Sequence, residues 1–391
     1  MRTGCALRAF IRLAILLTWA GGLVLAQVTL PPGHASAFIT AVPKVEPSTR
    51  LSSNGRYGQA QLDEQLRTPE QISKVRKRAE AGAPRDQFLL GYAYSKGLGE
   101  PQDLSQAVLW YRKAANSAEP AAITELGRMY VQGVGVSRDY QQALLWLRRA
   151  AADGYAPAQT DVGLLYFEGL GAETDYDTAL RWWEKAASQG YAPAQSNLGV
   201  AYLDGTGVSA NPAQAIQWFR SAAEAGLVTA QFDLASCYET GRGVAQDFVA
   251  AADWYQKAAR LGHAGAQNNL ALLYQSGRGV PQDTERALRF FLLAAGNGNM
   301  KAAINLANVF RTGNGVKADP ELAYMWLQIA ADGDEDVGQA LGLAAADLSQ
   351  QQLTEARQQA RTWRAQRQLD AAPTKSASLD ARESAESHST P

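Results

Sequence analysis

Cysteine and histidine are scarce in this sequence of 391 residues, which contains two cysteines and three histidines. Two cysteines cannot form a disulfide scaffold, and three histidines leave little material for a zinc site or a catalytic triad. The sequence also has no large excess of either charge, because 37 basic residues are balanced by 38 acidic ones. The formal charge of −1 gives no electrostatic reason to expect nucleic acid or a polybasic contact with membranes. The composition thus favours a globular protein without a cofactor.

The N-terminus has the pattern of an export signal. Arg2, Arg8 and Arg12 precede an apolar run over residues 13–26, and small residues follow. Cleavage after Ala26 and cleavage after Ala37 are both compatible with this pattern, and we favour a signal peptide over residues 1–37. The alternative is an uncleaved anchor, which is the one condition under which we expect contact with a membrane. Both place the rest of the chain outside the cytoplasm, either periplasmic or secreted.

A period of 36 residues dominates the middle of the chain. Pairs of glycines recur at this spacing seven times, from Gly97 and Gly99 to Gly313 and Gly315. An aromatic residue precedes each pair by three positions, and a tryptophan (once Phe290) follows the first glycine by thirteen. Seven repeats therefore cover residues 85–336 without an insertion. Such self-similarity is the signature of a solenoid.

Each repeat has the pattern of two helices. In the fourth, a first helix is expected from Pro193 to Asp204, with apolar residues at helical spacing, and glycines then break it. Asn211, or an aspartate in the other repeats, is placed to cap the second helix. In the fourth repeat we expect the buried face of the second helix to consist of Ala215, Trp218, Phe219, Ala222 and Ala223.

The repeat resembles the Sel-one-like repeat (SLR) family, a branch of the tetratricopeptide superfamily. The resemblance rests on Ala-Gln-x-x-Leu-Gly-x-x-Tyr-x-x-Gly-x-Gly-Val, followed by Asp, Ala, Trp-Tyr/Phe and Ala-Ala-x-x-Gly. It implies an all-α, α/α solenoid that winds as a right-handed superhelix and acts by binding proteins. It also suggests roles in assembling an envelope or secretion complex or in restraining the outer domain of a sensor.

Shorter segments flank the repeats. Residues 38–67 are rich in Pro, Ser, Gln and Gly and are predicted to be a flexible linker. Residues 68–84 are predicted to form a capping helix, with Thr68 and Gln71 as a capping box. Residues 337–369 are predicted to form C-terminal capping helices, which hide the apolar end of a solenoid. Residues 370–391 are expected to be a disordered tail.

The candidate sites for chemistry are weak, and we predict no enzyme and no metal. His263 is expected in an exposed turn, and Cys237 as a small buried residue. Residues 332–336 are acidic but lack the later glycine and glutamate of a calcium-binding EF-hand loop. Some cysteine-rich SLR proteins cleave β-lactams, which leaves a β-lactam-hydrolysing SLR enzyme as a remote alternative. Their paired cysteines are absent here, as is a Ser-x-x-Lys motif.

The exposed face of each first helix is the candidate binding surface, because in tetratricopeptide-like solenoids it lines the concave side. In repeats two to five this face carries five acids and one base, which would suit a basic or extended peptide. We therefore predict an exported, non-catalytic scaffold for an envelope or secreted protein. A polysaccharide- or peptidoglycan-binding solenoid is the alternative, because later repeats are rich in asparagine. The predicted contact residues are Glu125, Arg128, Asp161, Glu168, Asn197, Asp204, Asp233, Asn269, Asn305 and Asn308.

Overall fold

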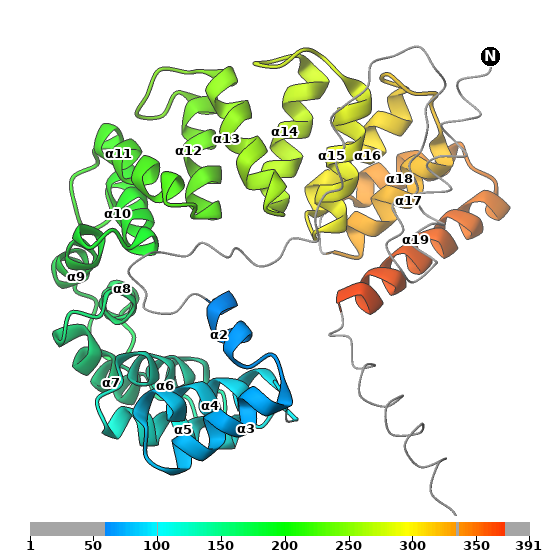
Figure 1. The fold of residues 1–391 in the computed structure, drawn as a ribbon. Coiled ribbons are helices and arrows are strands. Elements are labelled where there is room, and N and C mark those ends of the chain that lie inside the picture. Colours follow the sequence, from blue (N-terminus) through cyan, green and yellow to red (C-terminus); the bar gives the residue numbers. More distant parts are fainter. Residues whose placement is uncertain (1–58, 100, 334–335, 372–391) are drawn as a thin grey trace, which may run out of the picture. The chain divides into compact units, whose positions relative to one another are not determined.

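The computed structural model describes residues 59–371, apart from residue 100 and residues 334–335. Every regular element in this part of the chain is an α-helix (Figure 1). The predicted signal segment, most of the linker and nearly all of the tail lie outside the described residues. The described residues form two compact units. We call them the N-terminal unit (59–263 and 278–280) and the C-terminal unit (264–277 and 281–371).

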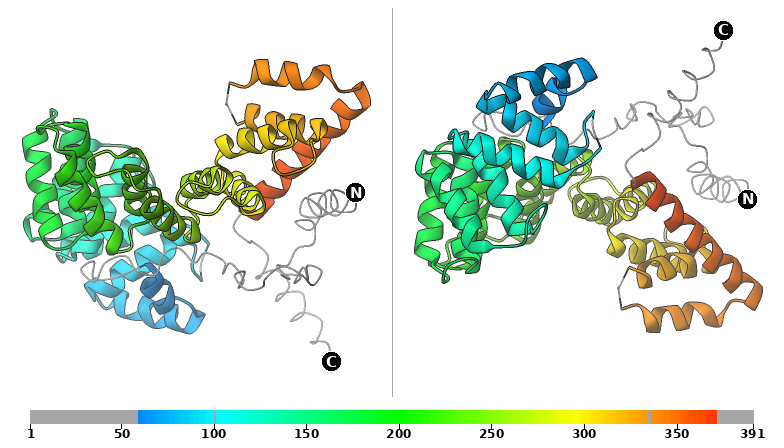
Figure 2. Two further views of the ribbon diagram at one scale, coloured as in Figure 1. Left: turned by 90° about the horizontal axis from the view of Figure 1, so that it is seen from above. Right: turned by 90° about the horizontal axis from the view of Figure 1, so that it is seen from below.

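The N-terminal unit contains five of the predicted helix pairs, stacked one beside the next (Figure 2). The first helices are α4 (Pro84–Lys96), α6 (Pro120–Gln132), α8 (Ala156–Glu168), α10 (Ala192–Asp204) and α12 (Val228–Thr240). The second helices are α5 (Leu104–Asn116), α7 (Tyr140–Ala152), α9 (Tyr176–Ser188), α11 (Pro212–Glu224) and α13 (Phe248–Arg260).

The C-terminal unit contains the sixth and seventh pairs and two further helices. These are α14 (Ala264–Ser276), α15 (Thr284–Gly296), α16 (Met300–Thr312), α17 (Pro320–Ala331), α18 (Gly338–Ala346) and α19 (Gln350–Ala371). Helix α19 runs along α17, where Trp363 meets Trp326 edge to face with ring centroids 5.4 Å apart. It therefore covers the last repeat with its apolar side and extends two residues into the predicted tail. None of the helices in the described ranges is both long and apolar enough to cross a membrane.

Capping residues set the helix ends where the sequence indicated. Asn211 accepts a hydrogen bond from the backbone N–H of Gln214 at 3.1 Å, which satisfies a donor that the first turn of α11 would leave free. Gly205 ends α10 in the left-handed region at φ +73°, which costs glycine little. The same arrangement recurs through the repeats, so the 36-residue period is a period of helix starts and stops.

The tryptophan position is a core position in two of the seven repeats, at Trp110 and Trp326, and is only half-buried in the other five. The next residue on each second helix is at most 5% exposed, and these residues are Tyr111, Leu147, Trp183, Phe219, Tyr255, Phe291 and Leu327. Trp218 is only half-buried, because one step along a helix turns a side chain by about 100° toward the edge of the buried stripe. In four repeats the ring is instead covered by a cation three residues later, such as Lys257 over Trp254 at 3.5 Å.

Glycine on the first helix makes room for this core residue. A Cβ atom added at Gly199 would lie 2.6 Å from Cε1 of Phe219, so only glycine permits this close approach. Successive repeats are then joined by buried glutamines. Gln159 and Gln195 each donate from the side-chain amide to a backbone carbonyl at the end of the preceding second helix, at 3.1 and 3.3 Å. Packing within and between repeats thus fixes the first helices relative to one another.

The linker prediction is corrected at its C-terminal end. Residues 59–65 form helix α2 (Gln59–Gln65), which is followed by α3 (Pro69–Glu80) with the expected capping box at Thr68. Leu62 and Leu66 are 6% and 2% exposed and join the core of the first repeats. They are four residues apart and lie on one side of the chain, a short apolar signal that the polar composition of the segment hid.

Candidate functional site

The predicted contact residues lie on the first helices, in what we call the inner ridge. It consists of the positions of Glu125, Arg128 and Gln132 and their counterparts every 36 residues. In Figure 1, α8 and α10 lie on the inner side of the curve of the N-terminal unit, and α9 and α11 on its outer side. Glu168, Asp204 and Asn308 are exposed, and the other seven predicted residues are half-buried. Because a partly buried charge is costly without a counter-charge, the partner of each charged side chain decides whether it is free to bind another molecule.

Arg128 lies at the centre of an ion-pair network. Its Nε donates to Asp161 of the next repeat at 2.7 Å, and its Nη1 donates to Glu125 at 2.8 Å. Burial alone would lower the pKa of Arg128, but the two carboxylates outweigh burial and raise it. Burial raises the pKa of Tyr155 to about 12, and Arg128 opposes that shift. Two acids counted as available for a partner are therefore occupied by this chain.

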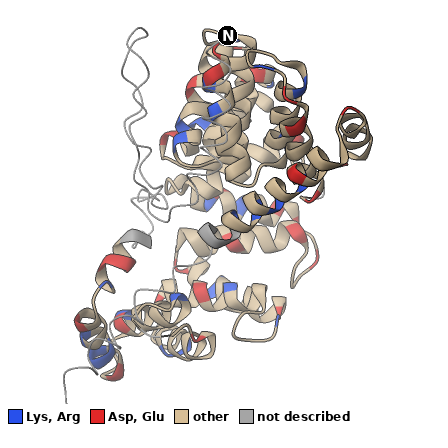
Figure 3. Ribbon diagram, turned by 90° about the vertical axis from the view of Figure 1, so that its right-hand side faces the viewer, with Lys and Arg blue, Asp and Glu red and all other residues tan. Residues whose placement is uncertain are grey.

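Asp204 is also paired within the chain. Arg242, in the turn after α12, donates to Asp204 at 3.1 Å and to the carbonyl of Leu203 at 2.8 Å. Both side chains are half exposed, so this ion pair is weak and open to exchange with another group. Acidic and basic residues occur on many of the helices (Figure 3), so each acid has to be assigned from its own contacts.

Asp233 occupies the same ridge position as Asp161, two repeats later, and differs from it. The residue that would correspond to Arg128 is Val200, and within the described part of the chain Asp233 has no hydrogen bond or ion pair. Burial without a counter-charge raises the pKa of Asp233 to about 6. A half-buried carboxylate without a partner is costly, and a cation placed beside it would remove most of that cost.

Apolar side chains accompany Asp233 on the ridge. Leu164 is 45% exposed and Val200 is 44% exposed, and they occupy the position that Arg128 has in the second repeat. Val200 stands to the unpaired Asp233 as Arg128 stands to Asp161, so an apolar side chain and a carboxylate together match the long side chain of lysine or arginine, which has an apolar stem and a charged end. This part of the ridge can therefore hold a basic side chain.

Helix α2 covers the inner ridge of the first repeat. The carboxylate of Asp63 on α2 accepts a hydrogen bond from Tyr92 at 2.8 Å, and Tyr92 is at the ridge position of Arg128. Leu89, at the ridge position of Asp161, is 2% exposed. Sequence reasoning missed this contact because it treated α2 as linker. A short segment of this chain thus already occupies one place on the ridge.

Two of the three asparagines on the ridge of the C-terminal unit take part in hydrogen bonds with other asparagines. Asn305 donates to Asn268 at 2.8 Å, and Asn268 donates to Asn269 at 3.2 Å. The side chain of Asn308 is exposed. The ridge in this unit therefore offers fewer open amides for sugar hydroxyls than the sequence suggested.

Cys237 and His263, the two side chains considered for chemistry, are both packed against other groups. Cys237 is 3% exposed, and burial raises the pKa of its thiol to about 11, which keeps it neutral and unreactive. His263 stacks on Phe232 with ring centroids 4.6 Å apart. It is therefore packed against a neighbouring ring, whereas the sequence predicted an exposed residue in a turn. Within the described ranges, no three His, Cys, Asp or Glu side chains are close enough to hold a metal ion.

Comparison with known proteins agrees with the repeat structure. The family model of the Sel1 repeat matches seven consecutive segments, namely residues 84–118, 120–155, 156–191, 192–227, 228–263, 264–299 and 301–335. No curated protein was found to match the chain.

Two solved structures are similar over most of the repeats. One is a protective antigen with an SLR fold from uropathogenic Escherichia coli, with 32% identity over 77% of this chain and a TM-score of 0.60. The present chain spans 64% of that antigen. The other is a Sel1 repeat protein from Oxalobacter formigenes, with 33% identity over 62% of this chain and 96% of that one, and a TM-score of 0.55.

Proposed function

This chain belongs to the Sel1 repeat family, whose members are in general non-catalytic scaffolds for protein–protein interaction, and from that premise we propose an exported scaffold that holds a protein partner on its inner ridge. The bound segment is extended or helical and carries a basic residue. That residue pairs with Asp233, and its stem packs on Val200.

The observation that carries this proposal is the difference between Asp161 and Asp233. The same position is paired with Arg128 in one repeat and left without a cation in another. An arginine or lysine of the partner would do at Asp233 what Arg128 does at Asp161. The position of α2 on the first repeat supports the proposal further, because it is a short segment held on this ridge by a hydrogen bond and two leucines.

Export is the second part of the proposal. It rests on the basic flank and the apolar run of residues 1–26. We expect a fusion of the full chain to an enzyme that is active only after export, such as alkaline phosphatase, to be active. Deletion of residues 13–26 should abolish that activity while the fusion is still synthesised. Equal activity with and without the run would refute export by this segment.

Photo-crosslinking tests the ridge directly. A photoreactive amino acid at Val200, next to Asp233, should capture a defined protein from the cell envelope. The same amino acid at the exposed Gln217, on the outer side of α11, should not. Asp233→Asn should abolish capture, because it removes the charge and keeps the shape. Glu168→Gln, which removes an exposed ridge acid two repeats away, is the matched control.

The results separate this proposal from its alternative. Capture that survives Asp233→Asn would remove Asp233 from the binding surface. Retention on cell-wall glycan, insensitive to both substitutions and to salt, would favour the polysaccharide-binding solenoid, because the proposed protein contact is ionic and should weaken with salt.

A further inference from the structure

Two successive second helices carry positive charge without any acid. Helices α5 and α7 contain no aspartate or glutamate, and near its C-terminal end each has two consecutive basic residues, Arg112-Lys113 and Arg148-Arg149. All four are exposed. The next second helix, α9, has Glu184 at the position of Arg148, so this one-sided charge ends there. The net charge of the chain conceals this local excess.

Exposed leucines share this face. Leu109 on α5 is 44% exposed and Leu145 on α7 is 57% exposed, at equivalent positions one repeat apart. The equivalent residues of the following repeats are Arg181 and Gln217, which are polar. Each leucine lies one helical turn before the basic pair, so apolar and positive side chains alternate along one stripe of each helix.

Aromatic rings lie beneath the cations and help to join the two stripes. Lys113 is 3.9 Å from the ring centroid of Trp110, and Arg149 is 4.8 Å from that of Trp146. Arg149 also donates to the carbonyl of Ala115 at the end of α5, at 3.5 Å. The outward sides of α5 and α7 therefore form one surface, which we call the α5–α7 face.

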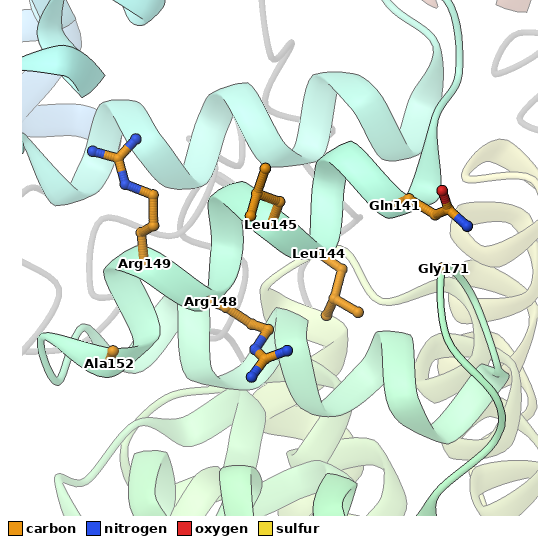
Figure 4. A pocket seen from close by; sticks show the side chains of 7 residues that line it. All are labelled: Gln141, Leu144, Leu145, Arg148, Arg149, Ala152 and Gly171. Atoms are coloured by element: carbon orange, nitrogen blue, oxygen red, sulfur yellow. The ribbon is translucent and has the colours of Figure 1, made fainter.

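A shallow depression marks this face on α7. It has a volume of about 540 Å³ and is lined by Gln141, Leu144, Leu145, Arg148, Arg149, Ala152 and Gly171. Figure 4 shows Arg148 and Arg149 extending to opposite sides of the helix, with leucine side chains along the turns before them. The depression therefore offers an apolar floor with a guanidinium on each side.

We propose that the α5–α7 face is a contact surface for a bilayer that contains anionic phospholipid. The guanidinium and ammonium groups would bind the phosphates, and Leu109 and Leu145 would enter the boundary between headgroups and acyl chains. Long basic side chains suit this position because their stems stay in apolar surroundings while the charge reaches the phosphates.

An acidic protein is the other occupant that the charge would allow. It would satisfy the four cations, but its carboxylates give Leu109 and Leu145 nothing apolar to pack on. A bilayer interface satisfies both kinds of side chain on one surface. The sequence limited contact with a membrane to an uncleaved N-terminal segment, whereas the α5–α7 face provides contact whether or not that segment remains.

The test places an environment-sensitive label on the face in the full chain. Cys5→Ser and Cys237→Ala remove the native thiols, and Leu145→Cys carries a nitrobenzoxadiazole group. Vesicles of phosphatidylcholine with phosphatidylglycerol should raise its fluorescence and shift it to shorter wavelength, because the label enters an apolar environment. Vesicles of phosphatidylcholine alone should not. Arg148→Glu should weaken the partitioning of the chain onto these vesicles about 30-fold, as expected for a change of two units of charge near an anionic surface.

The matched control is Gln217→Cys, the equivalent position on α11, labelled in the same way. If the chain attaches to vesicles through other segments, such as the apolar run near the N-terminus, this control will show it. The label at position 217 itself should remain in water and show no change in fluorescence. An equal response at both positions would overturn the proposal, and so would no response at 145. A response at 145 to soluble poly-glutamate in place of vesicles would assign the face to an acidic protein instead. Arg148 has an exposed side chain, so circular dichroism should show an intact fold in its variant.

Discussion

The packed interior and the inner ridge of the same repeats follow different rules. In the interior, the residue after the repeated tryptophan is a large apolar residue in every repeat, and it is buried in every one. On the ridge, one position reads Glu125, Asp161, Asn197 and Asp233 in four successive repeats. Packing of identical helix pairs dictates the first pattern. The second is free to vary, so the ridge is where this chain can differ from other solenoids of its kind.

The largest effect is expected from breaking the interior. Phe219→Ala should lower the free energy of unfolding by about 3–5 kcal/mol, because Phe219 is 1% exposed and packs against the backbone of Gly199. Trp218→Ala should cost about 1–2 kcal/mol, because its ring is only half-buried. Urea denaturation of the two variants measures the difference. Equal losses would place both residues in the core, as the sequence first suggested.

Removing Arg128, which pairs with two acids of the inner ridge, should cause the next largest loss of stability. Arg128→Ala leaves Asp161 and Glu125 half-buried without a cation. Breaking a fully buried pair costs more, but Arg128 is 37% exposed, so we expect a loss of about 2 kcal/mol. Arg128→Lys should recover part of it, because it restores the charge without the two-pronged geometry. A stable Arg128→Ala variant would mean that solvent already screens the network.

Asp233, the ridge acid without an ion-pair partner, should make the stability of the fold depend on pH. The pKa of Asp233 is about 6 in the folded chain and about 3.9 when unfolded, so the folded state binds the proton more tightly. Stability should therefore rise by about 1–2 kcal/mol as the pH falls from 7 toward 4, with the limiting value reduced because the side chain is only half-buried. Cys237, one turn away, has a pKa raised to about 11 and stays neutral in this range.

Asp233→Asn isolates this contribution. The variant should be more stable than the original chain at pH 7 and should lose the difference at pH 4, as measured by urea midpoints at both values. Other carboxylates titrate in the same range, so the comparison between the two proteins carries the information. An identical pH dependence for both would show that Asp233 is well solvated.

The fold was largely readable from the sequence because the repeat encodes it many times over. Glycines with positive φ, capping aspartates and alanine stripes each recur at one spacing, so an error in one repeat is corrected by the others. Helix α2 has no such support. Its signal is two leucines in a polar segment, and these join the core cluster that contains Leu89 and Tyr92, a contact between distant parts of the sequence. The sequence pattern placed both Trp218 and Phe219 on the buried face, but it did not show that five of the seven tryptophan positions lie at the edge of that face.

The sequence predicted where the ridge residues lie, but it did not predict which of them form ion pairs within the chain. The spacing correctly placed Asp161, Asp204 and Asp233 on first helices, and all three were counted as acids open to a partner. Their differences arise from Arg128, 33 residues before Asp161, and Arg242, 38 residues after Asp204. Such pairs are set by the rise and rotation from repeat to repeat, which only the three-dimensional structure supplies. Counting charges along a face therefore overstated the number of acids open to a partner.

The sharpest test of the comparison gives Asp233 a cation within the chain, as Asp161 already has in Arg128. Val200→Arg puts a guanidinium where Arg128 stands relative to Asp161, so it should lower the pKa of Asp233 and add up to about 1 kcal/mol of stability. It should also block the partner proposed for the ridge, because the chain then supplies its own cation. Carbon-13 detected titration of Asp233 measures the pKa, and Val200→Met controls for side-chain length. An unchanged pKa would show that the geometry at Asp161 is not repeated at Asp233, and that the two acids differ in more than the loss of an arginine.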